Sequence, residues 1–264
     1  MMKNLPAAAF FDVDGTLYDH KNNEIPPLHL QALKQLQEQG VKVCLCTGRA
    51  MPLLENLGIL PLFDWDGIVA GNGAYVYDQE GHVLYENCID PQVVQQIFDQ
   101  AKKEDVSLFV AGNTTFTTDT RPTTQKLLDD FHVQGIPTRW LEEEDRLCIV
   151  CIALDYPMQR KESFEHFPGI RSIRQMYAYD LVIEDLSKFH GIQVLLNHYG
   201  IDEHDYIGFG DSFNDVEMLE NAKVGVVMEN AAPDLLKQFK EHAPDVHEAG
   251  IYTYLLENGY IKGQ

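Results

Sequence analysis

The chain is poor in positive charge and has no long apolar run. Its 264 residues include 20 Lys and Arg against 41 Asp and Glu, which gives a formal net charge of −21. Nucleic acid and anionic membrane surfaces would be repelled by this charge, so we expect neither as a partner. No apolar stretch reaches the roughly 18 residues that a membrane span requires. The first residues also lack the basic and then apolar pattern of a secretory signal.

Cysteine is scarce as well. The five cysteines are an odd number in a large domain, which suits reduced thiols in a cytosol. No internal repeat or low-complexity tract is visible, and apolar residues make up 45% of the sequence, enough for a sizeable core. We therefore expect a cytoplasmic, globular protein of one or two domains.

The most informative stretch is residues 7–17, where an apolar run stops at Asp12 and Asp14 and Gly15 follows. An uninterrupted apolar run is typical of a strand buried on both faces of a parallel sheet. Side chains alternate along a strand, so both carboxylates would point the same way at its carboxyl end, where open α/β sheets bind ligands. Two like charges held together need a cation or a proton to compensate them. Taken alone, an acidic turn that starts a helix is the plainer interpretation.

Apolar runs alternate with amphipathic stretches towards both ends of the chain. After the first strand, further strands are expected at residues 41–46, 67–70, 206–209 and 224–228. Helices are expected at residues 28–39, 51–58, 188–199, 216–222 and 232–242. Such alternation gives parallel neighbouring strands joined by crossover helices. The hairpin signals and apolar alternation between these parts differ from this pattern and predict an inserted α+β unit.

Several polar residues fall at or beside the ends of the predicted core strands. They are Asp12 and Asp14, Thr47 and Gly48, Lys188, and Asp211 with Asn214 and Asp215. Three carboxylates at one place would supply the oxygen ligands that Mg²⁺ prefers. A carboxylate can also attack phosphorus to form an aspartyl phosphate, while a neighbouring carboxyl group moves a proton. A lysine, a hydroxyl and backbone amides would position the phosphoryl group and neutralise its charge.

Each of these groups has a plainer interpretation when it is taken alone. Thr47 with Gly48 fits a strand-end turn, and Lys188 fits a solvated helix residue. Residues 210–215 fit a calcium-like acidic loop or a capped helix start. Their joint presence in this order, together with Asp12 and Asp14, favours a shared site over coincidence.

Residues 11–17, 46–49, Lys188 and 210–215 together resemble the four motifs of the haloacid dehalogenase (HAD) superfamily phosphatases. An insert between the second and third motifs resembles the Cof-type branch, whose large cap domain lies there. Residues 72–74 and 228–231 also resemble this branch. The branch usually has Ser-Lys-Gly around the lysine and Met-Gly-Asn-Ala after the last strand, whereas this chain has Phe189 and Glu229 in place of the glycines.

The resemblance implies a role for each matching residue. Asp12 would be the nucleophile, and Asp14 would be the general acid and base and give a backbone carbonyl to the metal. The carboxylates of Asp12 and Asp211 would bind Mg²⁺, with Asp215 supporting the metal site. The phosphate would be held by Thr47, the amide of Gly48, Lys188 and Asn214. The second aspartate favours phosphoryl over carbon–halogen chemistry, because dehalogenases of the superfamily lack it and do not use Mg²⁺.

The expected fold class is α/β, a Rossmann-like parallel sheet core of residues 1–80 and 188–264 with an inserted α+β cap of residues 81–187. The expected function is Mg²⁺-dependent hydrolysis of a small phosphorylated metabolite, a sugar phosphate or a phosphorylated cofactor, through an aspartyl phosphate. The sequence leaves the substrate and the oligomeric state open.

Two other functions remain possible from the sequence. A phosphomutase would use the same intermediate but would need cations in the cap for a second phosphate. The candidates for these cations are Arg121, Arg139, Arg171 and Arg174. A non-catalytic regulatory or binding protein is the other alternative, and the presence of every motif position weighs against it.

Overall fold

The computed structural model describes residues 5–130, 132–147, 149–155, 162–164, 166–174 and 178–263. Its contacts divide the chain into two compact units. The first, which we call the core unit, comprises Met1–Gly48, Ile59–Tyr85 and Ser187–Gln264. The second, the insert unit, comprises Arg49–Gly58 and Glu86–Leu186.

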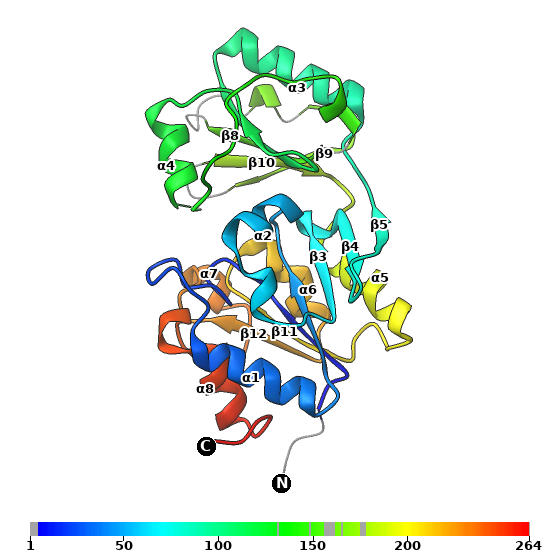
Figure 1. Ribbon diagram of the computed structural model, residues 1–264, viewed down its shortest axis with the longest axis vertical. Helices are drawn as coiled ribbons and strands as arrows, with labels where there is room; N and C mark the ends of the chain where they lie inside the picture. The colour runs from blue at the N-terminus through cyan, green and yellow to red at the C-terminus, as the bar shows by residue number, and fades with distance from the viewer. Residues whose placement is uncertain are drawn as a thin grey trace. The chain divides into compact units, whose positions relative to one another are not determined.

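The core unit is built on an eight-stranded sheet (Figure 1). Its parallel strands, in sheet order, are β13 (Glu241–Ala243), β12 (Val224–Met228), β11 (Tyr206–Gly210), β1 (Ala8–Phe11), β2 (Lys42–Cys46) and β3 (Gly67–Ala70). The sheet continues with β4 (Tyr75–Asp78), which is antiparallel to β3, and ends with β5 (Val83–Glu86). β1 therefore lies in the middle of the parallel part, between β2 and β11.

Helices cover both faces of this sheet, which explains why β1 is apolar throughout. They are α1 (Pro27–Glu38), α5 (Lys188–Tyr199), α6 (Val216–Asn221), α7 (Pro233–Leu236) and α8 (Gly250–Glu257). On one face, Phe10 lies in a buried cluster with Ile192 and Leu195 of α5. On the other, Phe11 stacks on Phe209, whose ring contacts Tyr254 of α8, and Figure 1 shows α8 beside α1. Full burial of both faces removes the apolar surface of β1 from water.

The insert unit has its own five-stranded antiparallel sheet, in the order β7-β6-β8-β10-β9. The strands are β6 (Ser107–Gly112), β7 (Phe116–Thr117), β8 (Ile149–Asp155), β9 (Ile170–Arg174) and β10 (Ala178–Ile183). Its helices are α2 (Met51–Leu57), α3 (Pro91–Glu104) and α4 (Pro122–Asp130). Ile97 and Phe98 of α3 pack against Leu108 and Leu181 of the sheet to form a separate core.

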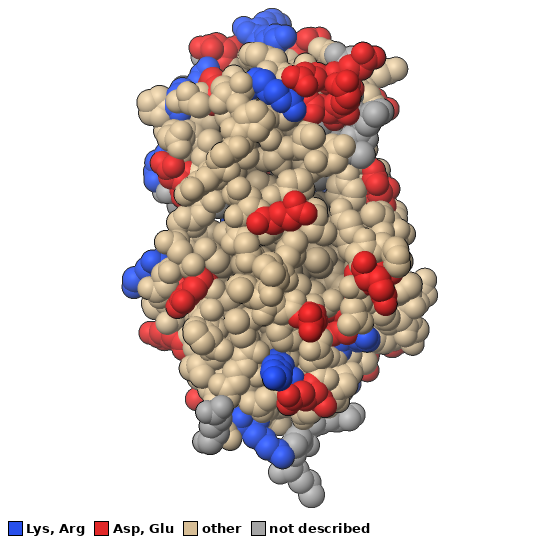
Figure 2. Space-filling view, in the orientation of Figure 1, with Lys and Arg blue, Asp and Glu red and all other residues tan. Residues whose placement is uncertain are grey.

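These two architectures confirm the expected fold class, a parallel α/β core that carries an inserted α+β unit. The borders differ in detail from the expected residues 81–187. Residues 81–85 lie in the core unit, because β5 extends the core sheet, and residues 49–58 group with the insert unit. Across the described residues, no helix is both long and apolar enough to span a membrane. Figure 2 shows acidic and basic side chains scattered over the visible face without a continuous basic patch.

Candidate active site

Three adjacent parallel strands bring the predicted aspartates and threonine to one edge of the core sheet. Asp12 follows β1, Thr47 follows β2, and Asp211 follows β11. Phe11, the last residue of β1, is in register with Leu45 of β2 and with Phe209 of β11. The carboxyl ends of these strands therefore meet, and such edges are where open α/β sheets bind ligands.

Lys188 is the first residue of α5 and places a positive charge between two of the carboxylates. Its Nζ lies 2.5 Å from Asp12 Oδ1 and 2.6 Å from Asp215 Oδ1, and the side chain is fully buried. Burial lowers the pKa of Lys188, but the charges of Asp12 and Asp215 outweigh it and raise the pKa above the ordinary lysine value. The side chain is therefore held as an ammonium ion.

One ammonium ion does not balance the acidic groups that surround it. Oxygens of Asp12, Asp211 and Asp215 lie within 4.8 Å of one another. Burial raises the pKa of Asp12 to about 7 against the opposing charge of Lys188. Loss of hydration, followed by the charge of Asp12, raises the pKa of Asp211 well above its usual value. A divalent cation would relieve this repulsion, and an all-carboxylate donor set with hard oxygens fits Mg²⁺.

Hydrogen bonds fix the two carboxylates that follow β11. Thr16 donates through Oγ1 to Asp211 Oδ1 at 3.0 Å. Asp215 Oδ2 accepts from the backbone N–H groups of Asp211 at 3.0 Å and Ser212 at 2.9 Å. Gly210 is required here, because a Cβ at this position would lie 2.5 Å from Asp215 Cγ. The loop therefore holds Asp215 under the site with one oxygen left for Lys188.

Asp14 stands apart from this carboxylate cluster. Its side chain is 24% exposed, and Oδ1 lies 2.6 Å from Nε2 of His20. Asp12, two residues earlier in the chain, is buried against Lys188 instead. The two aspartates of the first motif thus occupy different surroundings, as a nucleophile and a proton-transfer group would require.

Asn72 connects the remaining predicted residues. Asn214 donates through Nδ2 to Asn72 Oδ1 at 2.9 Å, and the Asn72 N–H donates to the carbonyl of Thr47 at 3.0 Å. A Cβ on Gly48 would lie 3.2 Å from Asn72 Oδ1, so Gly48 also borders this residue. Oδ1 of Asn214 is buried without a hydrogen-bond partner. All of the predicted site residues thus lie in the core unit around one edge of its sheet.

Several residues that hydrogen-bond to the site residues had no role predicted from the sequence. Asn72 has a left-handed backbone (φ 56°) inside Gly71–Gly73, and although residues 72–74 matched the Cof-type pattern, no role was expected for its side chain. Asn230 donates to the carbonyl of Gly15 at 2.8 Å and lies in the stretch 228–231 that matched the Cof-type pattern. Thr16 and His20 belong to the loop after β1, and nothing in the spacing indicated their contacts.

The two departures from the Cof-type pattern leave Lys188 in place. The ring of Phe189 stacks on His204 with centroids 6.0 Å apart and packs against the buried cluster below α5. Glu229 is exposed, and its N–H donates to the carbonyl of Ala243 at 2.8 Å. Neither residue takes the position of a group that the site needs.

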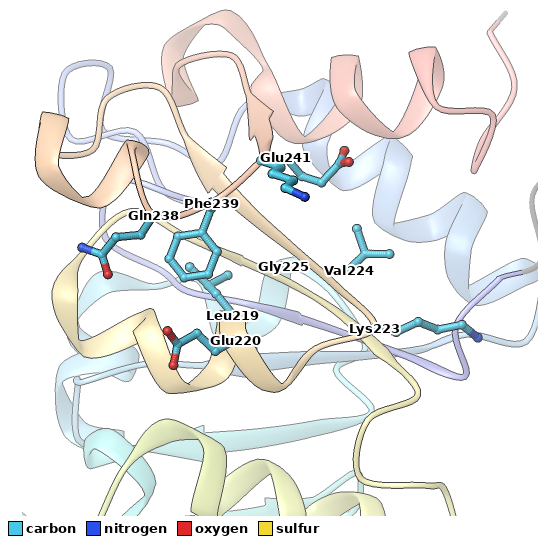
Figure 3. Close-up of a pocket in the computed structure, with 9 residues that line it drawn as sticks. Leu219, Glu220, Lys223, Val224, Gly225, Gln238, Phe239 and Glu241 are labelled. Atoms are coloured by element: carbon cyan, nitrogen blue, oxygen red, sulfur yellow. The ribbon is translucent and has the colours of Figure 1, made fainter.

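A surface hollow of about 440 Å³ elsewhere on the core unit is unrelated to these carboxylates (Figure 3). It is lined by Lys223, Val224 and Gly225, which lie at the start of β12, together with Phe239 and its neighbours. This is the amino end of a parallel strand, opposite the edge that carries Asp12. Its mixed charges single out no ligand.

Comparisons with known proteins agree with the geometry. The haloacid dehalogenase-like hydrolase family matches residues 9–255. The chain is 30% identical to a protein named putative phosphatase YkrA from Bacillus subtilis, covering 96% of this chain and 98% of the relative. An HMP-PP phosphatase from Citrobacter koseri is 27% identical, covering 96% of this chain and 97% of the relative.

Solved structures match along nearly the whole chain as well. The structure of the HAD subclass IIB sugar phosphatase BT4131 has a TM-score of 0.86 at 27% identity, covering 96% of this chain and 99% of that chain. A second structure has a TM-score of 0.88 at 26% identity, covering 97% of this chain and 100% of that chain. It is described with a trigonal-bipyramidal intermediate in a phosphoryl-transfer superfamily. These matches confirm the resemblance found in the motifs: the chain belongs to the haloacid dehalogenase-like hydrolase family.

Proposed function

We propose that this HAD-type phosphatase hydrolyses the phosphate monoester of a small metabolite with Mg²⁺ and a covalent phosphate on Asp12. The observation that carries the proposal is the buried contact of Asp12 with Lys188, beside Asp211 and Asp215. A nucleophile needs an ionised carboxylate, and Lys188 supplies the charge that favours ionisation. The excess of carboxylates calls for a metal that would also bind the substrate phosphate.

The reaction has two steps on the chain's own residues. In the first, a carboxylate oxygen of Asp12 bonds to phosphorus, the bond to the leaving oxygen breaks, and Asp14 gives its proton to that oxygen. In the second, a water molecule attacks phosphorus and passes a proton to Asp14, and the Asp12–phosphorus bond breaks. Inorganic phosphate leaves, and both aspartates return to their first state.

The phosphoryl group is placed by neighbouring residues of the same edge. These are Lys188, the hydroxyl of Thr47, the amide of Gly48 and the amide group of Asn214. Asp12 and Asp211, with the backbone carbonyl of Asp14 and the support of Asp215, would hold Mg²⁺, which supplies charge neutralisation at the phosphate when bound.

The substrate is a small phosphorylated metabolite, either a sugar phosphate or a phosphorylated cofactor. The relatives support this class, since one is named an HMP-PP phosphatase and another a sugar phosphatase. The insert unit would act as the cap that excludes water and selects the leaving group. Nucleic acid and membranes remain unexpected as partners because of the net charge of −21. The cytoplasmic location stays a prediction.

Hydrolysis is favoured over the mutase alternative by the arginines of the insert unit. Arg121 pairs with Asp119 at 2.7 Å and with Asp105 at 3.0 Å. Arg139 pairs with the buried Asp145 at 2.5 Å. The guanidinium groups of both arginines are thus paired with carboxylates of the insert unit, whereas a mutase needs cations that can bind a second phosphate. Arg171 donates to the carbonyl of Leu186 at 2.6 Å, and the side chain of Arg174 lies outside the described part of the structure.

The proposal is tested by phosphate release from a panel of phosphorylated metabolites, with Mg²⁺ or with a chelator. We expect activity on at least one small phosphomonoester, its loss on chelation, and near-complete loss in Asp12→Asn. Full activity in Asp12→Asn would contradict the assignment of Asp12 as the nucleophile. Transfer of phosphate between positions without release would favour the mutase, and binding of phosphometabolites without turnover would favour the binding protein.

A further inference from the structure

The loop after β1 forms an ordered hairpin that carries His20. Asp19 and Glu24 are bridged as antiparallel partners, and Asp19 is only 2% exposed. Its carboxylate accepts from the N–H of Lys21 at 2.8 Å and from Nδ2 of Asn22 at 2.6 Å. A loop held this way from within can place a side chain reproducibly.

From this loop, the side chain of His20 contacts the carboxylate of Asp14. Its Nε2 lies 2.6 Å from Asp14 Oδ1, and the two side chains are 25% and 24% exposed. The buried ring of Tyr18 meets the imidazole edge-on, with centroids 5.0 Å apart and planes at 70°. The imidazole is therefore oriented from one side by packing while it hydrogen-bonds the carboxylate with Nε2.

We propose that His20 is the positioning residue for Asp14 in protonation of the leaving group. This inference rests on the proposed function, because it assigns a partner to the group that would move the proton. Nε2–H donates to Oδ1 and fixes the rotation of the carboxyl group. When the Asp14 proton passes to the leaving oxygen, the same hydrogen bond stabilises the new carboxylate. The step moves only the proton of Asp14 and uses the Nε2–H of His20 as a hydrogen-bond donor.

The inference predicts that replacing His20 lowers kcat/KM by an amount that depends on the leaving group of the substrate. An alkyl phosphate needs its leaving oxygen protonated, whereas p-nitrophenolate leaves without a proton. In His20→Ala we expect kcat/KM to fall by roughly 10- to 100-fold on an alkyl phosphate substrate, within the range that general acid catalysis and orientation contribute. On p-nitrophenyl phosphate the fall should stay below about threefold. The ratio kcat/KM reports phosphoryl transfer to Asp12 and excludes the later hydrolysis step.

Matched variants separate positioning from structural support. His20→Gln keeps an N–H donor and should recover part of the loss on the alkyl phosphate. Asp14→Asn should show the same leaving-group dependence with a larger loss. His82→Ala removes the imidazole that lies 3.1 Å from Asp78 in the β4–β5 turn and should leave both substrates unchanged. Thermal unfolding of each variant checks that it is folded.

Each outcome distinguishes the inference from the function on which it rests. Equal losses on both substrates in His20→Ala and His20→Gln would overturn the inference, since a structural defect does not depend on the leaving group. Unchanged activity on the alkyl phosphate would overturn it too. If His20→Ala fails to fold, the comparison of His20→Gln with wild type decides in the same way. No turnover by the wild-type protein would instead overturn the proposed function.

Discussion

Lys188 carries one positive charge between two carboxylates that are almost as deeply buried as itself. Removal of one partner from such a cluster leaves uncompensated buried charge, which costs more than a surface pair contributes. We expect Lys188→Met to lower the free energy of unfolding by about 3–5 kcal/mol and to abolish phosphatase activity. Urea denaturation at neutral pH measures the first effect.

A surface pair provides the control for this substitution. Lys223 Nζ lies 2.6 Å from Asp205, a similar distance, but the side chains are 43% and 36% exposed. Lys223→Met should change the free energy of unfolding by no more than about 1 kcal/mol. Equal effects of the two substitutions would show that burial does not set the strength of the Lys188 contacts.

Asn72 holds Asn214 from a left-handed backbone conformation, which a residue with a Cβ rarely adopts. Asn72→Gly should keep the backbone and the stability, within about 1 kcal/mol, but lose the hydrogen bond to Asn214. We expect kcat/KM on the preferred substrate to fall roughly tenfold, as when one positioning hydrogen bond is lost. A stable Asn72→Gly with full kcat/KM would contradict the role of Asn72.

Residue identities predicted which acidic and basic side chains meet, but not the residues that hold them in place. Asp12, Lys188, Asp211 and Asp215 lie together as their places at predicted strand and helix ends required. The contact of Asn72 with Asn214 was not predicted, because a Gly-Asn-Gly stretch has the same local pattern whether it is a simple turn or a site element.

At the scale of elements, His29 of α1 links the loop after β1 to helix α8. Its Nδ1 lies 3.3 Å from the carbonyl of Leu17, and Nε2 accepts from the N–H of Ile251 at 3.2 Å. This arrangement requires a neutral imidazole with its hydrogen on Nδ1, because Nε2 is an acceptor. Burial lowers the pKa of His29 to about 4, although the hydrogen bond to Leu17 and the charge of Asp19 oppose the shift.

This contact predicts an acid-sensitive stability. The folded pKa of His29 lies below the unfolded value of 6.5, so the unfolded chain binds more protons between these values. The stabilisation is therefore complete above about pH 6.5 and is lost as pH falls towards 4, by roughly 3 kcal/mol. In His29→Gln this part of the pH dependence of unfolding should disappear. If the free energy of unfolding of His29→Gln changed with pH between 4.5 and 7 as steeply as that of the wild-type protein, this role of His29 would be contradicted.

Most elements were predictable because their patterns are local, but the helix expected at residues 232–242 was wrong in extent: α7 ends at Leu236, and the strand β13 begins at Glu241. The helix expected at residues 188–199 is α5, with Ser187 as its N-cap and Gly200 left-handed after it. The sheet edge was less predictable. Residues 81–85 were assigned to the inserted unit, yet β5 lies beside β4 at the end of the core sheet, because a hairpin signal identifies two paired strands and not the sheet that they join.

At the scale of the whole molecule, the net charge of −21 opposes the approach of an anionic phosphate ester. Lys188 provides positive charge at the site, but its effect is local. Added NaCl screens the long-range repulsion, so kcat/KM should rise by about two- to threefold between low and physiological ionic strength. The value of kcat at saturating substrate should stay constant. A steady fall of kcat/KM with salt would show that the approach is governed by positive charge instead.

The central claim is that phosphate passes through Asp12, and a trapping experiment tests it most directly. In Asp14→Asn the covalent phosphate should form from p-nitrophenyl phosphate, which needs no acid, and should persist because the base for its hydrolysis is missing. Acid quenching and mass spectrometry should then find about one phosphate per chain on the peptide that contains Asp12, and none in Asp12→Asn. Release of p-nitrophenolate without any phosphate on Asp12 would contradict the account.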